Sequence, residues 1–443
     1  MAIKILLPEK VNRIIHSIQA AGFEAYAVGG CVRDSILGRT PDDWDITTSA
    51  KPEDIKKIFR RTIDTGIEHG TVTVMLDKEG FEVTTYRIDG EYEDSRHPKE
   101  VTFTSNLRED LRRRDFTINA MAYNEEVGLV DIFGGISDIE KKTIRCVGDA
   151  KERFTEDALR MMRAVRFSAQ LGYSIADSTK EAIRELAPTL QKISAERIQV
   201  ELVKLITSDH PDYLKIAYET GITAEVLPEF DLCMETEQNN PHHMYSVGEH
   251  TLHAIKNVEK NKVLRLAMLF HDMGKPKAVT TDEKGIHHFY GHNEISSEIT
   301  RAVLRRLRFD NDTIYKTEKL VYFHDYRPEL TDKSIRRFVT KIGKELFPMY
   351  VLVQRADILA QSNYKRDQKL QNIQKAEEIF AGIIEREECL SLKDLAVTGK
   401  DLIEMGIKPG KEIGEILNGF LEMVIENPTL NKKEILLNKL KGE

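Results

Sequence analysis

A short apolar segment, a pair of glycines and two alternating aspartates near the start of this chain constrain its fold most strongly. Residues 24–28 are typical of a short strand, and Gly29-Gly30 follow at once; without a Cβ, their backbone N–H groups can approach phosphate oxygens closely. Arg33 adds positive charge nearby. Asp43 and Asp45 would project to the same face if they lie in a strand. Such a pair could hold two divalent cations about 3.5–4 Å apart, as nucleotidyl transfer requires.

Composition and cysteine usage indicate an ordinary soluble protein. With 443 residues and 41% hydrophobic content, the chain is long enough for roughly two to four domains. Its four cysteines are scattered without a C-x-x-C pair, which favours a reducing compartment and argues against disulfides or cysteine-bound zinc. No secretory signal begins the chain, and no run approaches about eighteen apolar residues. We expect a cytoplasmic protein with no membrane partner; the pattern specifies no oligomeric state.

The charge distribution is uneven. The net charge of −8 argues against a nucleic-acid partner, but basic residues outnumber acidic ones between Lys141 and Gln170, and residues 112–114 are three successive arginines. Such runs are commonly the solvated face of a helix. The alternative is a basic groove on an acidic protein.

The secondary-structure pattern changes along the chain. Residues 72–76 and 81–87 read as two strands of a hairpin around the turn 77–80. Glu82 in the second strand is either a third carboxylate beside Asp43 and Asp45 or an ordinary surface glutamate. From Arg153 onward strand signals are scarce and helical spacing dominates, with breaks near Gly172 and several prolines. The chain is therefore expected to be α+β at the front and α after.

Three further motifs follow in order. Arg113-Arg114-Asp115 precede an apolar run, where Arg114 could bind a triphosphate or pair with an aspartate to fix a helix start. Residues 131–135 have the form D-x-x-G-G, and residues 156–167 have the form E-D-x-x-R-x-x-R-A-x-R-F. Together with the opening glycines and aspartates, this ordered set resembles the class II tRNA nucleotidyltransferase and poly(A) polymerase family. The resemblance covers about the first 200 residues and extends to residues 194–201, which are similar to the family's neck motif.

The resemblance implies roles for particular residues. Asp43 and Asp45 would be the catalytic carboxylates and would bind Mg²⁺. An RNA 3′-hydroxyl would attack the α-phosphorus of a nucleotide. Arg163 and Arg166 belong to the nucleotide site by resemblance, although triphosphate binding and helix bracing suit them equally. The full expected nucleotide-binding set is Gly30, Arg33, Arg114, Asp157, Arg160, Arg163 and Arg166.

Asp157 and Arg160 are three residues apart, so on one helix they could point at one base together. Cytosine and adenine both present an amino donor beside a ring-nitrogen acceptor. A carboxylate and a guanidinium would therefore accept either base, whereas uracil and guanine would leave buried groups unpaired at roughly 1–3 kcal/mol each.

The family contains CCA-adding, CC-only, A-only and poly(A) enzymes. Residues 89–98 resemble the flexible loop with which full CCA enzymes change from cytosine to adenine, which favours CCA addition with tRNA, CTP and ATP as partners. A poly(A) polymerase or an A-only enzyme is the alternative. The glycine-containing tail from Leu395 resembles the tRNA-gripping end of the bacterial enzymes, or is simply a helical cap.

Four histidines and two aspartates form a second constellation. His271 and Asp272 follow the apolar run 264–270, so a helix would end by presenting an imidazole beside a carboxylate. Imidazole and carboxylate without thiolate suit a catalytic divalent-metal site. Over residues 245–365 the order is similar to that of the HD phosphohydrolase superfamily, which implies a divalent transition metal or Mg²⁺. Related HD domains act on 2′- and 2′,3′-cyclic phosphates or persist as scaffolds. The six positions are His250, His271, Asp272, His292, His324 and Asp357.

These resemblances imply an α+β head with a mixed sheet and helices, followed by an all-α neck, body, HD domain and tail. The expected borders are 1–150 for the nucleotidyltransferase head, 151–240 for a helical neck and RNA-binding region, 241–385 for the HD domain and 386–443 for the tail. Two other interpretations stay open. The head could be a vestigial site on an RNA-binding protein, or a nucleotide sensor that regulates an HD domain acting on free nucleotides.

Overall fold

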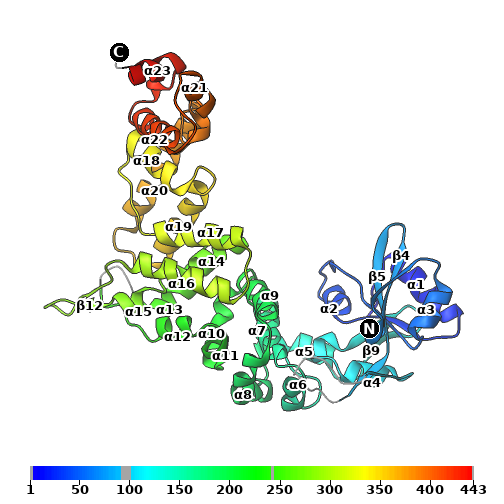
Figure 1. The fold of residues 1–443 in the computed structure, drawn as a ribbon. Helices are drawn as coiled ribbons and strands as arrows, with labels where there is room; N and C mark the ends of the chain where they lie inside the picture. The colour runs from blue at the N-terminus through cyan, green and yellow to red at the C-terminus, as the bar shows by residue number, and fades with distance from the viewer. Residues whose placement is uncertain (1–2, 91–100, 241–243, 442–443) are drawn as a thin grey trace. The chain divides into compact units, whose positions relative to one another are not determined.

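The computed structural model describes residues 3–90, 101–240 and 244–441. Contacts between residues divide the chain into two compact units, Met1–Pro228 and Glu229–Glu443 (Figure 1). No helix among the described residues is both long and apolar enough to cross a membrane.

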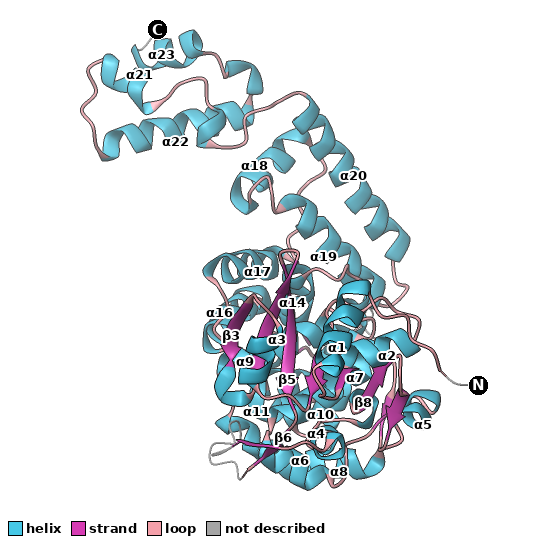
Figure 2. Ribbon diagram, turned by 90° about the vertical axis from the view of Figure 1, so that its right-hand side faces the viewer, coloured by secondary structure: helices cyan, strands magenta, loops and turns pink. Residues whose placement is uncertain are grey.

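A seven-stranded sheet dominates the first unit (Figure 2). β2 and β5 are parallel, whereas the other neighbouring strands are antiparallel, so the sheet is mixed, as predicted. In spatial order the strands are β3 (Thr62–Gly66), β4 (Thr71–Leu76), β5 (Glu79–Thr85), β2 (Ile46–Thr48), β1 (Ala25–Val28), β8 (Met121–Asn124) and β9 (Gly128–Asp131).

The predicted hairpin is β4–β5, with a tighter turn than expected. Leu76 pairs with Glu79, which leaves only Asp77 and Lys78 in the loop, with φ angles of 47° and 71°. Two left-handed residues match the right-handed twist of the strands. A second small ladder joins β6 (Arg87–Asp89) and β7 (Val101–Phe103).

Helices accompany the strands in the first unit and make up most of its later residues. α1 buries Val11, Ile14, Ile15 and Ile18, the spacing of one helix face. The helices of this unit are α1 (Glu9–Ala20), α2 (Gly30–Ile36), α3 (Pro52–Ile58), α4 (Leu107–Arg112), α5 (Gly135–Glu140), α6 (Ala150–Glu156), α7 (Leu159–Leu171), α8 (Asp177–Leu186), α9 (Ala195–Ile206), α10 (Leu214–Glu219) and α11 (Ile222–Val226).

The second unit is almost entirely helical, with α14 at its centre. Residues 264–270 of α14 are all buried, and the helix packs against α13, α16, α17 and α19. Its helices are α12 (Pro228–Met234), which begins at the border, α13 (Val247–Lys256), α14 (Lys262–Phe270), α15 (Lys275–Ala278), α16 (His292–Arg306), α17 (Asn311–Phe323), α18 (Asp332–Ile342), α19 (Phe347–Ala360), α20 (Arg366–Glu385), α21 (Gly399–Glu404), α22 (Lys411–Glu426) and α23 (Lys433–Lys441).

Two short ladders depart from the helical expectation after residue 153. β10 (Thr143–Ile144) pairs with β11 (Ser174–Ile175), and β12 (Thr280–Thr281) pairs with β13 (His287–His288). Each strand has only two residues, too few to give a periodic signal in the sequence. The α+β front and helical remainder are confirmed.

Candidate functional site

The two aspartates of the head lie at the start of β2. The expectation that both belong to a strand is wrong, because β2 begins at Ile46. The Asp45 carbonyl nevertheless accepts a 3.0 Å hydrogen bond from the Val28 N–H, so chain pairing with β1 reaches back to this residue. The carboxylates of Asp43 and Asp45 are exposed and therefore open to a ligand.

Glu82 lies beside this pair. The parallel register joins Ile46 to Val83, so Asp45, just before β2, aligns with Glu82 on β5. Crowding by protein around the Asp45 carboxyl raises its pKa, and the negative charges of Asp43 and Glu82 raise it further, while Arg114 opposes them. Three exposed carboxylates that repel one another suit hard divalent cations.

Gly29 brings the backbone close to Arg114. Its φ of 86° is in the left-handed region, and a Cβ there would lie 3.1 Å from Arg114 Nη1. Arg114 Nη2 lies 3.5 Å from Asp110 Oδ2, so an aspartate holds the arginine beside the glycine pair. Gly30 then starts α2. A side chain at residue 29 would therefore crowd the Arg114 guanidinium.

The Arg33 side chain is mostly buried and makes polar contacts within the protein. It is 8% exposed, pairs with Asp34 at 2.8 Å through Nη2, and donates from Nη1 to Asn119 Oδ1 at 2.6 Å. Asn119 in turn donates to Asp115. Arg33 therefore braces α2 against the segment that follows Arg114.

The expectation that Asp157 and Arg160 lie on one helix is wrong. Asp157 lies between α6 and α7 with extended backbone, and its Oδ1 accepts from the Leu159 N–H at 3.1 Å. Its Oδ2 lies 2.8 Å from Arg197 Nη2, whereas Arg160 pairs with Glu156 at 2.6 Å. The two side chains lie at one helix junction, each with a partner inside the protein.

Arg163 and Arg166 make bracing contacts within the first unit. Arg163 Nη2 lies 2.6 Å from Asp115 Oδ2, and Arg166 Nε lies 3.0 Å from Glu201 Oε2 on α9. Burial would raise the pKa of Asp115, but Arg163 outweighs it and the pKa falls to about 2. Of the two roles that the sequence left open for these arginines, the ion pairs match helix bracing.

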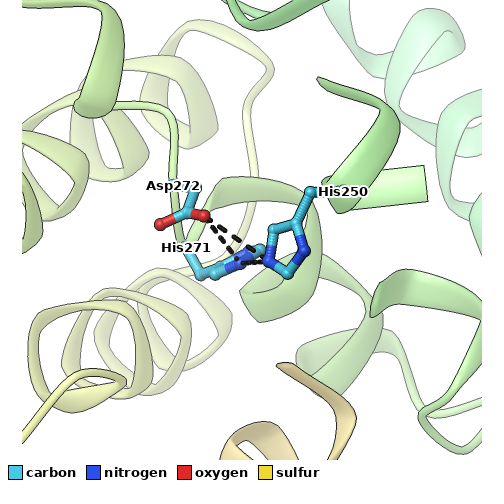
Figure 3. Close-up of side chains that lie close together, drawn as sticks. All are labelled: His250, His271 and Asp272. Atoms are coloured by element: carbon cyan, nitrogen blue, oxygen red, sulfur yellow. Dashed lines mark hydrogen bonds and ion pairs between the residues drawn. The ribbon is translucent and has the colours of Figure 1, made fainter. Parts of the chain in front are cut away.

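The second constellation comes together in the second unit, where five helices contribute to it. His250 is on α13, His271 and Asp272 follow α14, and Figure 3 shows these three side chains turned toward one another. His292 begins α16, His324 follows α17, and Asp357 is on α19. All six are at least nine-tenths buried. We call these six residues the HD centre.

The ring orientations in the HD centre suit metal binding. Each histidine directs Nδ1 at a backbone carbonyl, so that Nε2 faces the interior of the centre, and His250 Nε2 also lies 2.9 Å from Asp357 Oδ1. The carbonyls belong to Ala360, Met268, Phe289 and Val321, at 3.4, 2.7, 2.7 and 2.6 Å.

The Nε2 atoms face one another in pairs. His250 and His271 are 3.2 Å apart through Nε2, and so are His292 and His324. Ligands of one divalent ion that lie about 2 Å from the metal are themselves about 3 Å apart, so these separations match those of metal ligands. The donor set therefore fits a divalent metal.

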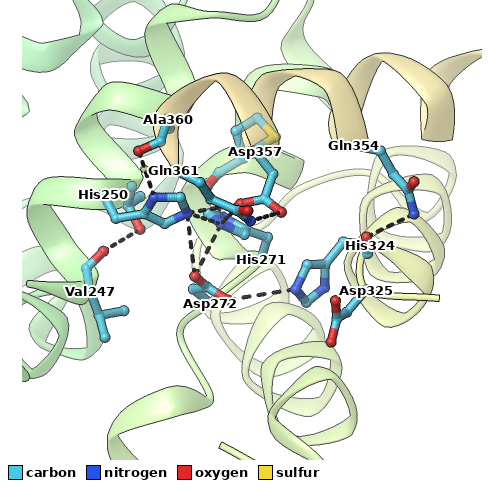
Figure 4. Close-up of polar contacts among 12 residues, drawn as sticks. Val247, His250, His271, Asp272, His324, Asp325, Gln354, Asp357, Ala360 and Gln361 are labelled. Carbon is cyan, nitrogen blue, oxygen red and sulfur yellow. Dashed lines mark hydrogen bonds and ion pairs between the residues drawn. The ribbon is translucent and has the colours of Figure 1, made fainter. Parts of the chain in front are cut away.

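The donors form two groups that share one residue. His250 and His271 with Asp272 are one group, and Asp272 with His292 and His324 the other; within each, the ligand atoms lie within 4.8 Å of one another. Asp272 Oδ2 lies 3.2 Å from His271 Nε2, and its Oδ1 lies 3.4 Å from His292 Nε2. The two oxygens thus face different groups (Figure 4).

Charge balance keeps the carboxylates ionised. Burial would raise the pKa of Asp272, but His271 and Lys275 hold it well below its usual range. Burial acts likewise on Asp357, where His250 prevails and the pKa is also well below its usual range. Burial lowers the pKa of His324, which favours the neutral imidazole that binds metals.

Sequence reasoning missed several of these partners. It gave no role to Lys275, whose Nζ lies 2.7 Å from Asp272 Oδ2, although its position three residues after Asp272 was a usable signal. Asn119, which links Arg33 to Asp115, follows Arg113-Arg114-Asp115 closely in the sequence but was given no role. Most of the expected switching loop, residues 91–98, is outside the described residues.

Three protein-family models match parts of this chain. A model described as "Poly A polymerase head domain" matches residues 25–145. Models described as "Probable RNA and SrmB- binding site of polymerase A" and "tRNA nucleotidyltransferase domain 2 putative" match residues 172–234 and 278–440.

Whole-chain relatives share one name. The CCA-adding enzyme of Enterococcus faecalis is 35% identical over 97% of this chain and 95% of its own, and that of Pediococcus pentosaceus is 36% identical over 97% and 96%. Among solved structures, the Bacillus stearothermophilus CCA-adding enzyme in complex with CTP has a TM-score of 0.72 at 30% identity and covers 99% of both chains. The Thermotoga maritima CCA-adding enzyme complexed with tRNA has a TM-score of 0.60 at 20% identity, a likeness of fold.

Proposed function

Because this chain belongs to the family of CCA-adding enzymes, we propose that it adds CCA to the 3′ ends of tRNA from CTP and ATP in the cytoplasm. The observation that carries the proposal is the alignment of Asp45 with Glu82, beside Asp43 and near Arg114. Mg²⁺ bound by these carboxylates would activate the RNA 3′-hydroxyl and neutralise the charge of the departing pyrophosphate. The α-phosphorus gains a bond to the 3′-oxygen and loses its bond to the β-phosphate oxygen.

Positive side chains of the head would orient the triphosphate. Arg114 lies beside Gly29, where the absence of a Cβ leaves room for phosphate oxygens, and the backbone of Gly30 continues the same surface. Arg33, Arg163 and Arg166 would act indirectly, because their contacts with Asn119, Asp115 and Glu201 hold the helices around the site.

Asp157 and Arg160 would select the base. Asp157 would accept from the exocyclic amino group of cytosine or adenine, and Arg160 would donate to the adjacent ring nitrogen. The incoming base would replace their present partners, Arg197 and Glu156. Protein side chains, and not a nucleic-acid template, would then determine which nucleotide is added.

A nucleotide-addition assay tests this function. A tRNA lacking its 3′ end, incubated with labelled CTP and ATP, should gain three nucleotides and then no more. A long adenylate tail would instead indicate a poly(A) polymerase, and addition of adenosine only to a tRNA that already ends in CC would indicate an A-only enzyme. An Asp43→Ala, Asp45→Ala double variant that extends tRNA normally would contradict the proposed chemistry.

We also propose that the HD centre is a metal-dependent phosphohydrolase that removes 2′- or 2′,3′-cyclic phosphates from damaged RNA ends. The observation that favours it is the convergence of four histidine Nε2 atoms on the two oxygens of Asp272. A bound divalent ion would supply the charge that lowers the pKa of an attacking water. With a cyclic phosphate, the water oxygen bonds to phosphorus, one ring P–O bond breaks, and the released ribose oxygen takes a proton, which leaves a monoester. A second water attacks the same phosphorus, the remaining P–O bond to ribose breaks, that ribose oxygen takes a proton, and inorganic phosphate leaves.

Hydrolysis should be measured with Mn²⁺, Ni²⁺, Co²⁺ and Mg²⁺ in turn. His271→Ala should abolish it, whereas His253→Ala, an exposed histidine on α13, should not. Equal rates in both variants would contradict a role for the HD centre. Hydrolysis of free nucleotides in preference to RNA ends would favour the alternative in which the head is a sensor.

A further inference from the structure

A cavity of about 790 Å³ opens beside the HD centre, within the second unit. Asp272, His292, His324 and Asp357 form part of its wall, so a bound molecule would reach the metal ligands directly. Pockets for small ligands commonly have about 300–1,000 Å³. The cavity is therefore much larger than a phosphate group needs and has room for a nucleotide.

Two cationic side chains line the cavity near Asp357. Arg327 Nη1 donates to the His324 carbonyl at 2.8 Å, and its Nη2 lies 3.9 Å from Asp357 Oδ2. Lys369 Nζ donates to Gln361 Oε1 at 2.6 Å, and Gln361 donates to Asp357 Oδ2 at 2.9 Å. Both cations are thus fixed by groups that also hold metal ligands.

This wall carries Arg327 and Lys369 together with the carboxylate of Asp325, whose Oδ1 lies 3.7 Å from Arg327 Nη2. Burial lowers the pKa of Lys369. The negative charge of Asp357 acts to raise this pKa, and the positive charge of Arg327 lowers it further. The metal ligands themselves would be neutralised by bound cations. A phosphate between Arg327 and Lys369 would relieve the repulsion between these two positive charges.

Aromatic side chains also line the cavity. Tyr290 is 79% exposed, and its ring stacks on His288 with centroids 5.5 Å apart and planes inclined by 5°. His288 Nε2 lies 3.0 Å from Asp282 Oδ2, and this contact fixes the His288 ring. Both rings line the cavity. Their arrangement resembles the stacking platforms on which proteins bind unpaired bases.

We propose that this cavity binds the terminal nucleotide of an RNA, with its phosphate against Arg327 and Lys369 and its base on Tyr290. The inference rests on the proposed phosphohydrolase and deepens it, because it makes the base as well as the phosphate part of the recognised substrate. An isolated phosphoester would engage only the cationic wall.

Binding to the full-length, metal-loaded protein tests this inference without turnover. A phosphonate analogue of adenosine 2′-monophosphate, which cannot be hydrolysed, and inorganic phosphate are the two probes, titrated separately by calorimetry. Tyr290→Ala should weaken the nucleotide about tenfold and leave phosphate unchanged. Tyr290→Phe should bind the nucleotide like the wild type, and Lys369→Gln should weaken both probes. Tyr315→Ala, an exposed tyrosine on α17 outside the cavity lining, is the matched control.

The outcomes separate this inference from the proposed activity. Nucleotide affinity that is unchanged in Tyr290→Ala, or reduced equally in Tyr315→Ala, overturns the stacking site. Reduced affinity in Tyr290→Ala alone supports it, whether or not the wild type hydrolyses cyclic phosphates. Absence of hydrolysis would count against the phosphohydrolase only. Binding of nucleotides by the head is common to all variants, so differences between them report the cavity.

Discussion

Arg166 Nε lies 3.0 Å from Glu201 Oε2, and this ion pair joins α7 to α9 where both side chains are almost fully buried. Removal of one partner leaves the other charged without compensation, whereas apolar replacement of both avoids that cost. Glu201→Ala should therefore destabilise the first unit by about 3–5 kcal/mol, and Arg166→Met with Glu201→Leu by much less. Urea unfolding followed by the fluorescence of Trp44, the chain's single tryptophan, measures both. Equal losses in the two proteins would contradict the pairing.

Gly29→Ala should lower nucleotide addition at least tenfold. The new Cβ would lie 3.1 Å from Arg114 Nη1, at a φ of 86° that is strained for alanine. Gly38→Ala is the control, because Gly38 also has a positive φ, of 68°, but has nothing within 4 Å of the added carbon. Steady-state addition of CTP to a shortened tRNA separates the contact from the backbone strain. Equal losses in the two variants would argue that backbone strain alone is responsible.

Glu82→Gln should reduce kcat for nucleotide addition by about 100-fold and raise the Mg²⁺ concentration needed for half-maximal activity. The reason is the loss of one of three carboxylates around the expected metal site. Glu79→Gln is the control, since Glu79 is on the same strand and pairs with Lys10 at 3.0 Å instead. A Glu82→Gln enzyme with unchanged metal dependence would show that Glu82 is an ordinary surface residue.

Metal content should follow the two ligand groups of the HD centre. Elemental analysis is expected to find up to two divalent ions there, with one lost in His292→Ala and both lost in Asp272→Ala, because Asp272 belongs to both groups. Removal of metal by a chelator should lower the melting temperature of the second unit, since ions that bind the folded state stabilise it. Full metal content in Asp272→Ala would contradict the shared ligand.

Acid should destabilise the first unit in part through Asp115. Its pKa of about 2 in the folded protein is below the unfolded value of about 3.9, so its stabilising effect is complete above about pH 4 and disappears as the pH falls toward 2. The stability advantage of the wild type over Asp115→Asn should shrink by about 2 kcal/mol across that range. Unfolding free energies measured at several pH values test this; a constant difference would contradict it.

Local patterns were enough to predict much of the fold. A short apolar run identified β1, alternation identified the β4–β5 hairpin, and the order of six His and Asp residues indicated the cluster that the structure brings together in the second unit. Asp157 was misplaced because the pattern around it is helical on both sides. Its side chain bonds the Leu159 N–H, a local contact that competes with helix continuation. The signal was an aspartate directly before an apolar helical run.

Long-range pairs could not be predicted in the same way. Arg166 meets Glu201, and Arg33 meets Asn119, only because tertiary packing brings different elements together. Nothing in either segment alone distinguishes a buried ion pair from two solvated charges. The register of β2 against β5, which aligns Asp45 with Glu82, is likewise a property of the folded sheet.

The position of Asp272 between two ligand groups makes the HD centre fragile in evolution. A change in one codon at this residue would disable both halves together, whereas loss of any one histidine would spare half of the centre. The carboxylates of the head lie in the other unit and would be untouched. Selection could therefore discard the proposed phosphohydrolase in a single step without affecting the head, and the helices would persist as a scaffold without chemistry of their own.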